Sequence, residues 1–179
     1  MFLRDSGFVQ PGSQEGLPLK RAALIFTFGT RTVAVATHKL NGQCHCGNIL
    51  VDVELTHALA TYNPRACDCD FCHKHGASYV SDPQGTLRIH IKDERHLGKY
   101  RQGSGIADCL LCRNCGVLVA ITFQNDGQLY AAVNSKAIDG VPHFGKGKSV
   151  SPRKLSESEK IGRWKDIWFT NVTIDTIRA

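Results

Sequence analysis

The sequence lacks any long apolar segment. No apolar run is longer than Ala22–Phe28, which is far shorter than the roughly 18 to 20 residues that a helix needs to cross a bilayer. This run follows Lys20-Arg21 and imitates a secretory signal, but Arg31 interrupts the apolar region soon after it. We therefore expect no membrane span, a cytoplasmic location, and an N-terminal extension over residues 1–36 that is poorly ordered or forms a strand.

Acidic residues are in the minority. The chain has 22 Lys and Arg against 16 Asp and Glu, which gives a formal net charge of +6. This balance favours anionic partners, but the basic residues are scattered. Their densest group, Lys146–Lys154, lies in a Gly-, Ser- and Pro-rich stretch without interleaved aromatics, so it indicates a solvated loop. Nucleic acid is not an expected partner.

Helical signals are also few, and strand patterns predominate. Alternation of apolar and polar residues and an abundance of β-branched residues predict strands over Ile49–Leu55, Gly76–Val80, Thr86–Ile91, Gly116–Phe123 and Leu129–Val133. Asn125-Asp126-Gly127 predicts a hairpin turn between the last two. Asn41-Gly42 suits another tight turn, and Gly98–Gly105 is expected to be a loop. The fold class is therefore mainly β.

One helix is expected near the C-terminus. Ser156 and Glu159 match a capping box, which predicts a helix of one or two turns through Ile161 and Trp164. With 179 residues and a hydrophobic fraction of 42%, the chain suits a single compact domain. We place this domain over residues 37–135, with residues 136–179 as a C-terminal extension that packs on it.

Eight cysteines fall into three groups, Cys44-His45-Cys46-Gly47, Cys67-Asp68-Cys69-Asp70-Phe71-Cys72 and Cys109-Leu110-Leu111-Cys112-Arg113-Asn114-Cys115-Gly116. Buried hydrophobic cysteines have no reason to recur at such short spacings, and a disulfide framework requires an oxidising compartment. Iron–sulfur ligation is a further alternative, but the ferredoxin spacings are absent. The pattern therefore favours zinc.

Two of the groups contain a similar knuckle. Cys44-x-Cys46-Gly47 and Cys112-x-x-Cys115-Gly116 each supply two thiolates, as in many structural zinc sites with four tetrahedral ligands. The glycine after each pair permits the positive φ of a tight turn. We expect these four cysteines to close one structural site and to tie an early strand to a later one.

Cys67, Cys69 and Cys72 then remain as three ligands from one short segment. Three protein ligands leave a fourth position for water or substrate, which is the arrangement of catalytic zinc. Candidates to close that position are His73, His75 and Cys109.

Cys109 has two interpretations. If Ile106–Cys112 is extended, Cys109 and Cys112 point to opposite faces, so they do not share the first site. Cys109 is then either a plain buried thiol or a ligand of the second zinc.

Three segments, Leu40–Gly47, Cys67–Ala77 and Cys112–Gly116, resemble the glutathione-dependent formaldehyde-activating enzyme (GFA) family, which includes the centromere protein V type domain. The likeness covers roughly residues 38–135, with the motifs in family order and spacing. It implies a mainly β, Mss4-like fold with short helical segments, a zinc-binding domain over residues 37–135 and two zinc ions per chain. The ligands that it implies are Cys44, Cys46, Cys112 and Cys115 for the closed site and Cys67, Cys69 and Cys72 for the second.

The resemblance also implies a carbon–sulfur lyase activity with a small-molecule thiol and an aldehyde as partners. In this reaction glutathione adds to formaldehyde and gives S-(hydroxymethyl)glutathione. Our hypothesis is that the second zinc holds the incoming sulfur as a thiolate while His73, Lys74 or His75 stabilises the developing alkoxide. The alternative is a non-catalytic zinc scaffold or interaction module, which Cys109 as a fourth ligand would favour.

Overall fold

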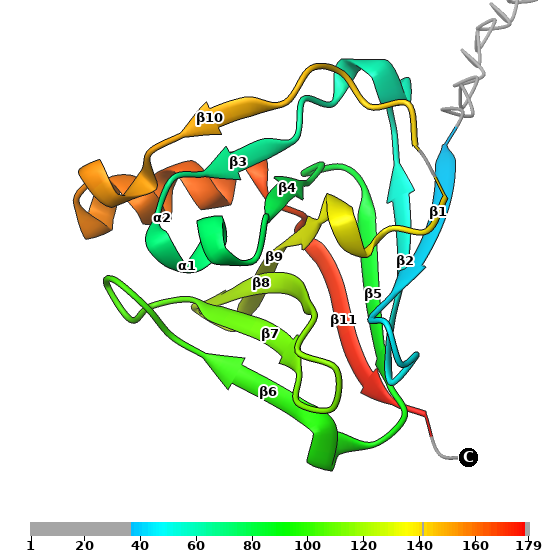
Figure 1. Ribbon diagram of the computed structural model, residues 1–179. Coiled ribbons are helices and arrows are strands. Elements are labelled where there is room, and N and C mark those ends of the chain that lie inside the picture. The colour runs from blue at the N-terminus through cyan, green and yellow to red at the C-terminus, as the bar shows by residue number, and fades with distance from the viewer. Residues whose placement is uncertain (1–36, 141, 178–179) are drawn as a thin grey trace, which may run out of the picture. The chain divides into compact units, whose positions relative to one another are not determined.

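The described part of the chain is built mainly of strands. The computed structural model describes residues 37–140 and 142–177, so the interpretation of residues 1–36 as an extension lies outside it. Eleven strands form two sheets, with two α-helices and single turns of 3-10 helix between them (Figure 1). The predicted mainly β fold class is confirmed.

The smaller sheet has the strand order β1-β2-β5-β11. Its strands are β1 (His38–Gln43), β2 (Ile49–Leu55), β5 (Thr86–Ile91) and β11 (Asn171–Thr176). The β1–β2 and β2–β5 pairs are antiparallel, whereas β11 runs parallel to β5 along the edge of the sheet. The first and last strands of the described chain thus belong to one sheet (Figure 1).

The larger sheet has seven strands in the order β10-β3-β4-β9-β8-β7-β6. Their bounds are β3 (Arg65–Cys67), β4 (Ser78–Val80), β6 (Leu97–Tyr100), β7 (Asp108–Cys112), β8 (Leu118–Asn125), β9 (Gln128–Asn134) and β10 (Lys148–Val150). All neighbours are antiparallel except β10 and β3. The last segment of the chain therefore supplies one edge strand to each sheet, β10 to the larger and β11 to the smaller.

Helix α2 (Glu157–Ile167) begins at the predicted capping box. The Ser156 N–H donates to Glu159 Oε2 at 2.7 Å, and the Glu159 N–H donates to Ser156 Oγ at 3.3 Å, so this prediction is confirmed. The helix has 11 residues and is longer than the expected one or two turns. It continues because Trp164 and Ile167 extend its apolar stripe over the larger sheet.

The remaining helical elements are short. They are α1 (Asp70–Lys74) and the 3-10 turns η1 (Leu59–Thr61), η2 (Glu94–His96), η3 (Ser135–Ala137) and η4 (Pro152–Lys154). None of the helices described is both long and apolar enough to cross a membrane.

Every second residue of β2 and β5 is apolar and buried, so one face of each strand lies in the core. Val51 lies opposite Ile89 and Val53 lies opposite Leu87 in antiparallel register, and all four are buried. Burying a side chain of this kind stabilises the folded state by about 1.5–3 kcal/mol. The period of two in the sequence thus predicts both the strands and the face that they bury.

Helix α2 covers a second buried cluster on the larger sheet. Trp164 and Trp168 stack with their ring centroids 4.7 Å apart, and Phe123 meets Trp164 edge-on at 5.3 Å. Three cysteines are buried in the same cluster, Cys69, Cys72 and Cys109. Trp164 of α2 and Trp168, which follows the helix, therefore lie in the same cluster as a group of thiols.

The predicted turn at Asn41-Gly42 is wrong. Both residues lie inside β1, where Gly42 forms an antiparallel bridge with Ile138. A Cβ on Gly42 would overlap the carbonyl oxygen of Ala137. This glycine allows two backbone segments to approach each other and does not reverse the chain.

Two glycine-to-alanine substitutions are expected to change stability in opposite directions. Gly42→Ala forces a methyl group against the backbone of Ala137 and should lower the free energy of unfolding by about 2 kcal/mol or more. Gly162→Ala, within α2, has open space around its Cβ and should raise that free energy by about 0.5–1 kcal/mol. Urea unfolding measures both changes. Equal stability of the two variants would contradict the close approach of β1 to Ala137.

Candidate metal centres

Four cysteines converge at two hairpin turns. Their sulfur atoms all lie within 4.8 Å of one another, and the residues are Cys44, Cys46, Cys112 and Cys115. The first two lie between β1 and β2, and the other two lie where β7 ends and the chain turns toward β8. The cluster therefore joins the smaller sheet to the larger one.

Distances within this first cluster fit a tetrahedral thiolate site. Zn–S bonds of roughly 2.3 Å in tetrahedral arrangement place two sulfurs roughly 3.8 Å apart. The Cys44–Cys46 and Cys46–Cys112 sulfur distances are 3.7 and 3.5 Å. The Ile49 N–H also donates to Cys44 Sγ at 3.3 Å, which stabilises negative charge on that sulfur. The donor set fits a metal ion that prefers soft sulfur ligands.

Gly47 and Gly116 close the two turns with positive φ, as the sequence predicts. Their φ angles are 72° and 75°. The Gly47 N–H donates to the Cys44 carbonyl and the Gly116 N–H donates to the Cys112 carbonyl, both at 2.8 Å. A side chain at either position would be strained, so glycine supports the cluster through the backbone.

The thiols of the first cluster differ in acidity. Hydrogen bonds, chiefly with the Asn114 side chain, lower the pKa of Cys46 to about 6. Burial raises the pKa of Cys112 to about 12 and also raises the pKa of Cys44. Because a metal binds thiolates, loading the cluster releases protons, and its affinity rises with pH.

The second group of cysteines lies where β3 leads into α1. The sulfur atoms of Cys67, Cys69 and Cys72 lie within 4.8 Å of one another. Cys69 is the N-cap of α1, and its sulfur accepts the N–H of Cys72 at 3.4 Å. Tyr79, on the neighbouring β4, brings its hydroxyl oxygen to 3.3 Å from Cys72 Sγ. These three sulfurs can hold a metal ion from one side.

Acidity in the second cluster is uneven as well. The interaction with Cys72 lowers the pKa of Cys67 to about 6, although burial opposes this shift. The same interaction and burial raise the pKa of Cys72. Burial and the charge of Cys72 raise the pKa of Tyr79, so its hydroxyl keeps its proton. Either group can be the donor while Cys72 is a thiol, whereas the Tyr79 hydroxyl is the donor once Cys72 is a thiolate.

Cys109 stays apart from both clusters. Cys112 lies in the first cluster, whereas Cys109, earlier in β7, faces the other side of the strand, as predicted. Among the described residues its sulfur does not join the group within 4.8 Å. Burial and then the negative charge of Cys69 raise the pKa of Cys109 to about 12. It is a buried, neutral thiol near the second cluster.

The three candidates that follow Cys72 in the sequence lie outside the second cluster of sulfurs. His73, Lys74 and His75 are exposed at the end of α1. Neither histidine joins the three-sulfur group among the residues described. His75 packs against Phe71 with ring centroids 4.6 Å apart. Neither histidine therefore adds a ligand to the cluster, although His73 lines a second cavity together with Cys67 and Cys72.

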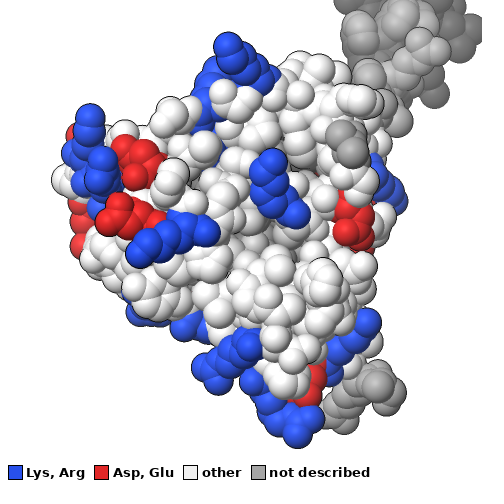
Figure 2. All heavy atoms as spheres, in the orientation of Figure 1, with Lys and Arg blue, Asp and Glu red and all other residues white. Residues whose placement is uncertain are grey.

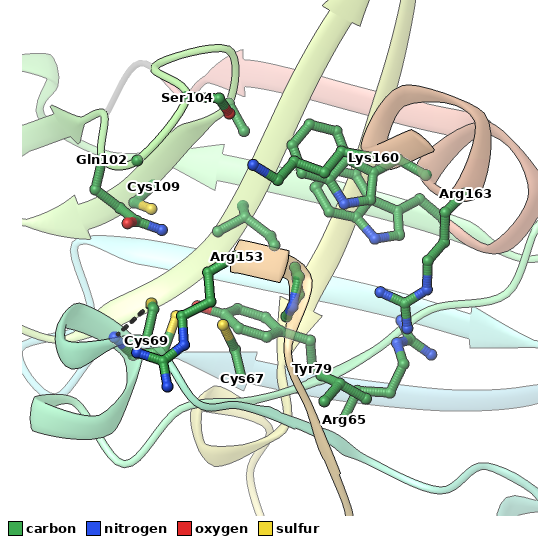
Figure 3. A pocket seen from close by; sticks show the side chains of 18 residues that line it. Arg65, Cys67, Cys69, Tyr79, Gln102, Ser104, Cys109, Arg153, Lys160 and Arg163 are labelled. Atoms are coloured by element: carbon green, nitrogen blue, oxygen red, sulfur yellow. Dashed lines mark hydrogen bonds between the residues drawn. The ribbon is translucent and has the colours of Figure 1, made fainter. Parts of the chain in front are cut away.

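A cavity of about 110 Å³ opens beside the second cluster (Figure 3). Its wall contains all three sulfurs of that cluster, together with Cys109 and Tyr79. The apolar wall residues include Ala107, Ile121, Val150, Trp164 and Trp168, and the polar ones include Gln102, Ser104, Arg65, Arg153, Lys160 and Arg163. None of His73, Lys74 and His75 lines this cavity.

Strand register explains why several of these side chains share one face. Arg65 lies opposite Tyr79 on one neighbouring strand, and Cys67 lies opposite Val150 on the other. Residues two apart in a strand point to the same side, so Arg65 and Cys67 face the cavity together. Three adjacent strands of the larger sheet thus form one wall.

A family profile described as glutathione-dependent formaldehyde-activating enzyme matches residues 39–153, more than half of the chain. The chain belongs to this GFA family. Among solved structures, a protein from Rhodobacter sphaeroides is similar at 27% sequence identity and a TM-score of 0.48, over 62% of this chain and 100% of its own. No curated protein gives a significant match. The resemblance carried by the cysteine motifs is confirmed.

The GFA-family profile covers the cysteines but not the whole cavity. All seven clustered cysteines lie within residues 39–153. Lys160, Arg163, Trp164 and Trp168 come from α2 and the residue that follows it, beyond the matched segment. Part of the cavity wall in this GFA-family chain is therefore built by residues that the profile does not describe.

Arg65 and Tyr79 are cavity residues that sequence reasoning missed. A signal exists for Arg65, because it precedes Cys67 by two positions and a strand places both on one face. Tyr79 belongs to the predicted short strand, found as Ser78–Val80. Nothing local distinguishes a core tyrosine from one whose hydroxyl contacts a sulfur.

Tyr79→Phe is expected to weaken metal binding at the second cluster by about tenfold to a hundredfold. The substitution removes the hydroxyl that contacts Cys72 Sγ but keeps the buried ring. Competition with a chelator measures the affinity of each cluster. Tyr100→Phe, whose ring is exposed, is the matched control and should change neither affinity. Equal affinities in the two variants would contradict the role of the Tyr79 hydroxyl.

Proposed function

We propose that this chain is a zinc-dependent enzyme that adds a thiol, glutathione, to formaldehyde. The product is S-(hydroxymethyl)glutathione, and the reaction is that of a carbon–sulfur lyase run toward addition. The observation that carries the proposal is the three-sulfur cluster in the wall of a cavity, which no fourth ligand completes among the described residues. Membership of the GFA family supports the choice of thiol and aldehyde.

We assign zinc to both clusters, which gives two ions per chain. The four-cysteine cluster would hold a closed structural ion, and Cys67, Cys69 and Cys72 would hold an ion with one exchangeable position. Sulfur donors at nearly tetrahedral separations favour zinc over harder ions. When bound at the three-sulfur cluster, zinc supplies a positive charge that lowers the pKa of a substrate thiol.

The cavity wall can orient the reactants and exclude water. Ile121, Val150 and Trp164 provide apolar surface beside the sulfurs. During addition the thiolate sulfur forms a bond to the carbonyl carbon, the π electrons of the C=O bond move to oxygen, and the thiol proton ends on that oxygen. Gln102 and Ser104 line the same cavity and offer hydrogen-bond donors to the developing negative oxygen.

Exchange measured by NMR tests this proposal, because the adduct also forms without a catalyst. With isotope-labelled formaldehyde and glutathione at equilibrium, the zinc-loaded protein should speed exchange between free aldehyde and adduct well above the rate in buffer. Metal analysis should return two zinc ions per chain, one of them accessible to an added thiol. Exchange at the buffer rate together with two inert ions would support the alternative, a non-catalytic zinc scaffold.

We further propose that residues 37–135 and 136–179 act as one unit in the cytoplasm, with residues 1–36 as an extension. Trp164 and Trp168 in the cavity wall and the pairing of β11 with β5 support the shared unit. All eight cysteines are free, which favours a reducing compartment. A chain ending at residue 135 should lose exchange activity, and retained activity would contradict the shared unit. Cell fractionation tests the location.

A further inference from the structure

Four basic side chains line the cavity, and no acidic side chain of the described residues does so. Arg65 comes from β3, Arg153 from η4, and Lys160 and Arg163 from α2. Elsewhere, Lys and Arg are dispersed over the face of the molecule seen in Figure 2. These four basic groups give the cavity wall a positive charge.

Acidic partners are scarce around these groups. Arg153 pairs with Asp68, with Nε 3.4 Å from Oδ2. Across residues 37–140 and 142–177, no carboxylate lies within the 4.0 Å of an ion pair from Arg65, Lys160 or Arg163. Three positive charges of the cavity wall thus have no protein counter-ion in the part of the chain described.

Arg65 is positioned by neutral contacts. Its Nη2 donates to Ser81 Oγ at 2.5 Å, and that hydroxyl donates to the carbonyl of Ile167 at the end of α2. A guanidinium has five N–H donors, so this bond leaves others free. In Figure 3 the guanidinium groups of Arg65 and Arg163 point toward one another.

Two facing guanidinium groups repel each other, and partial burial strengthens the repulsion. Burial and the charge of Arg163 lower the pKa of Arg65 to about 10. At that value Arg65 is still protonated at neutral pH, so both positive charges persist. An anion bound between the two groups would relieve the repulsion and use the free N–H donors.

The rest of the wall restricts the kind of anion. Trp164 and Trp168 stack with an interplanar angle of 19° and form apolar surface in the cavity. The three-sulfur cluster lies in the same cavity. Guanidinium groups are planar and match a planar carboxylate. A ligand with a carboxylate, a short apolar body and a thiol fits all three parts of the wall.

We propose that Arg65 and Arg163 bind a carboxylate of the thiol substrate, so that the cavity selects an anionic thiol over a neutral one. This inference deepens the proposed function and rests on it for the reacting thiol. Arg163 is then a specificity-determining residue, and it comes from α2, outside the residues that the family profile matches.

Tryptophan fluorescence tests carboxylate binding without turnover. The chain has two tryptophans, and both line the cavity, so their emission reports its occupancy. The zinc-loaded protein is titrated with S-methylglutathione, which lacks a reactive thiol, and with its diethyl ester, which lacks the negative carboxylates. We expect the acid to change the emission saturably and the ester to bind at least about tenfold more weakly.

Matched variants locate the effect. Arg163→Gln should weaken binding of S-methylglutathione by about tenfold or more and leave the affinity for the ester unchanged. Lys165→Gln removes the same charge from α2 outside the cavity, where Lys165 lies 4.0 Å from Asp126, and should change neither affinity. Equal affinities for acid and ester, or equal weakening by the two variants, would overturn the proposal. If glyoxylate changes the emission but S-methylglutathione does not, the two arginines bind a carboxylate of the aldehyde substrate. That result would also overturn the proposal.

The two proposals fail in different experiments. Acid-selective binding without faster formaldehyde exchange contradicts the proposed catalysis and supports the carboxylate site. Faster exchange without a preference for the acid contradicts the carboxylate site and supports the proposed catalysis.

Discussion

Cys112→Ser is expected to lower the free energy of unfolding by about 5 kcal/mol or more, which is enough to unfold a domain of ordinary stability. Cys112 is fully buried and belongs to the cluster that joins the hairpin turn of β1 and β2 to the turn after β7. A structural zinc site contributes its binding free energy directly to folding. Losing one of its four sulfurs removes most of that contribution and weakens this connection between the two sheets.

Cys109→Ala is the matched control, because Cys109 lies on the same strand and is also buried. It lies outside both clusters, so only packing is lost, at a cost of about 1–2 kcal/mol. Urea unfolding followed by circular dichroism, with zinc release recorded in parallel, measures both variants. A Cys112→Ser protein as stable as Cys109→Ala would show that the first cluster is not a structural metal site.

Cys69→Ser is expected to reduce catalysed formaldehyde exchange by about a hundredfold or more, close to the rate in buffer. The substitution removes one of three sulfurs from the second cluster. Serine is a good N-cap, so its hydroxyl can replace the Cys69 sulfur in accepting the N–H of Cys72. The fold should therefore survive, and metal analysis should fall from two zinc ions to one.

Cys109→Ser provides the comparison for the metal count. If Cys109 is not a ligand, this variant keeps two zinc ions, whereas Cys69→Ser keeps one. A loss of zinc in Cys109→Ser would make Cys109 the fourth ligand and favour the scaffold. If formaldehyde exchange in Cys69→Ser is as fast as in the wild type, the second cluster takes no part in catalysis.

Much of the fold follows from local pattern. The predicted strands over Ile49–Leu55 and Thr86–Ile91 coincide with β2 and β5, because alternation places every second residue in the core. The hairpin predicted at Asn125-Asp126-Gly127 is confirmed between β8 and β9. Asp126 and Gly127 have φ angles of 49° and 80°, as a two-residue turn of this type requires.

Other elements depend on partners that no local pattern reveals. The predicted loop over Gly98–Gly105 is wrong at its start, where Leu97–Tyr100 form β6. This strand lies at the edge of the larger sheet and pairs with β7 alone. Leu111 packs over Gly98, where a Cβ would lie 2.7 Å from Leu111 Cδ1. The glycine that suggests a loop here lies in a strand and lets Leu111 approach it closely.

The candidate site divides in the same way. The spacing of the cysteines predicts how their sulfurs divide between two clusters, because cysteines that are close in sequence can bind the same metal ion. The structure brings the sulfurs together in these two clusters. Arg65 and Arg163 were not predicted, because they approach only after α2 packs against the larger sheet. The metal-ligating cysteines can thus be predicted from the sequence, whereas the residues that line the cavity beside them can be identified only from the tertiary structure.

The last segment of the chain supplies an edge strand to each sheet, with α2 between β10 and β11. During synthesis from the N-terminus, both cysteine clusters can assemble before this segment has left the ribosome, because Cys115 is the last of their members. Trp164 and Trp168 reach the cavity wall afterwards. A nascent chain therefore carries all seven clustered cysteines before it carries the aromatic residues that form part of the cavity wall.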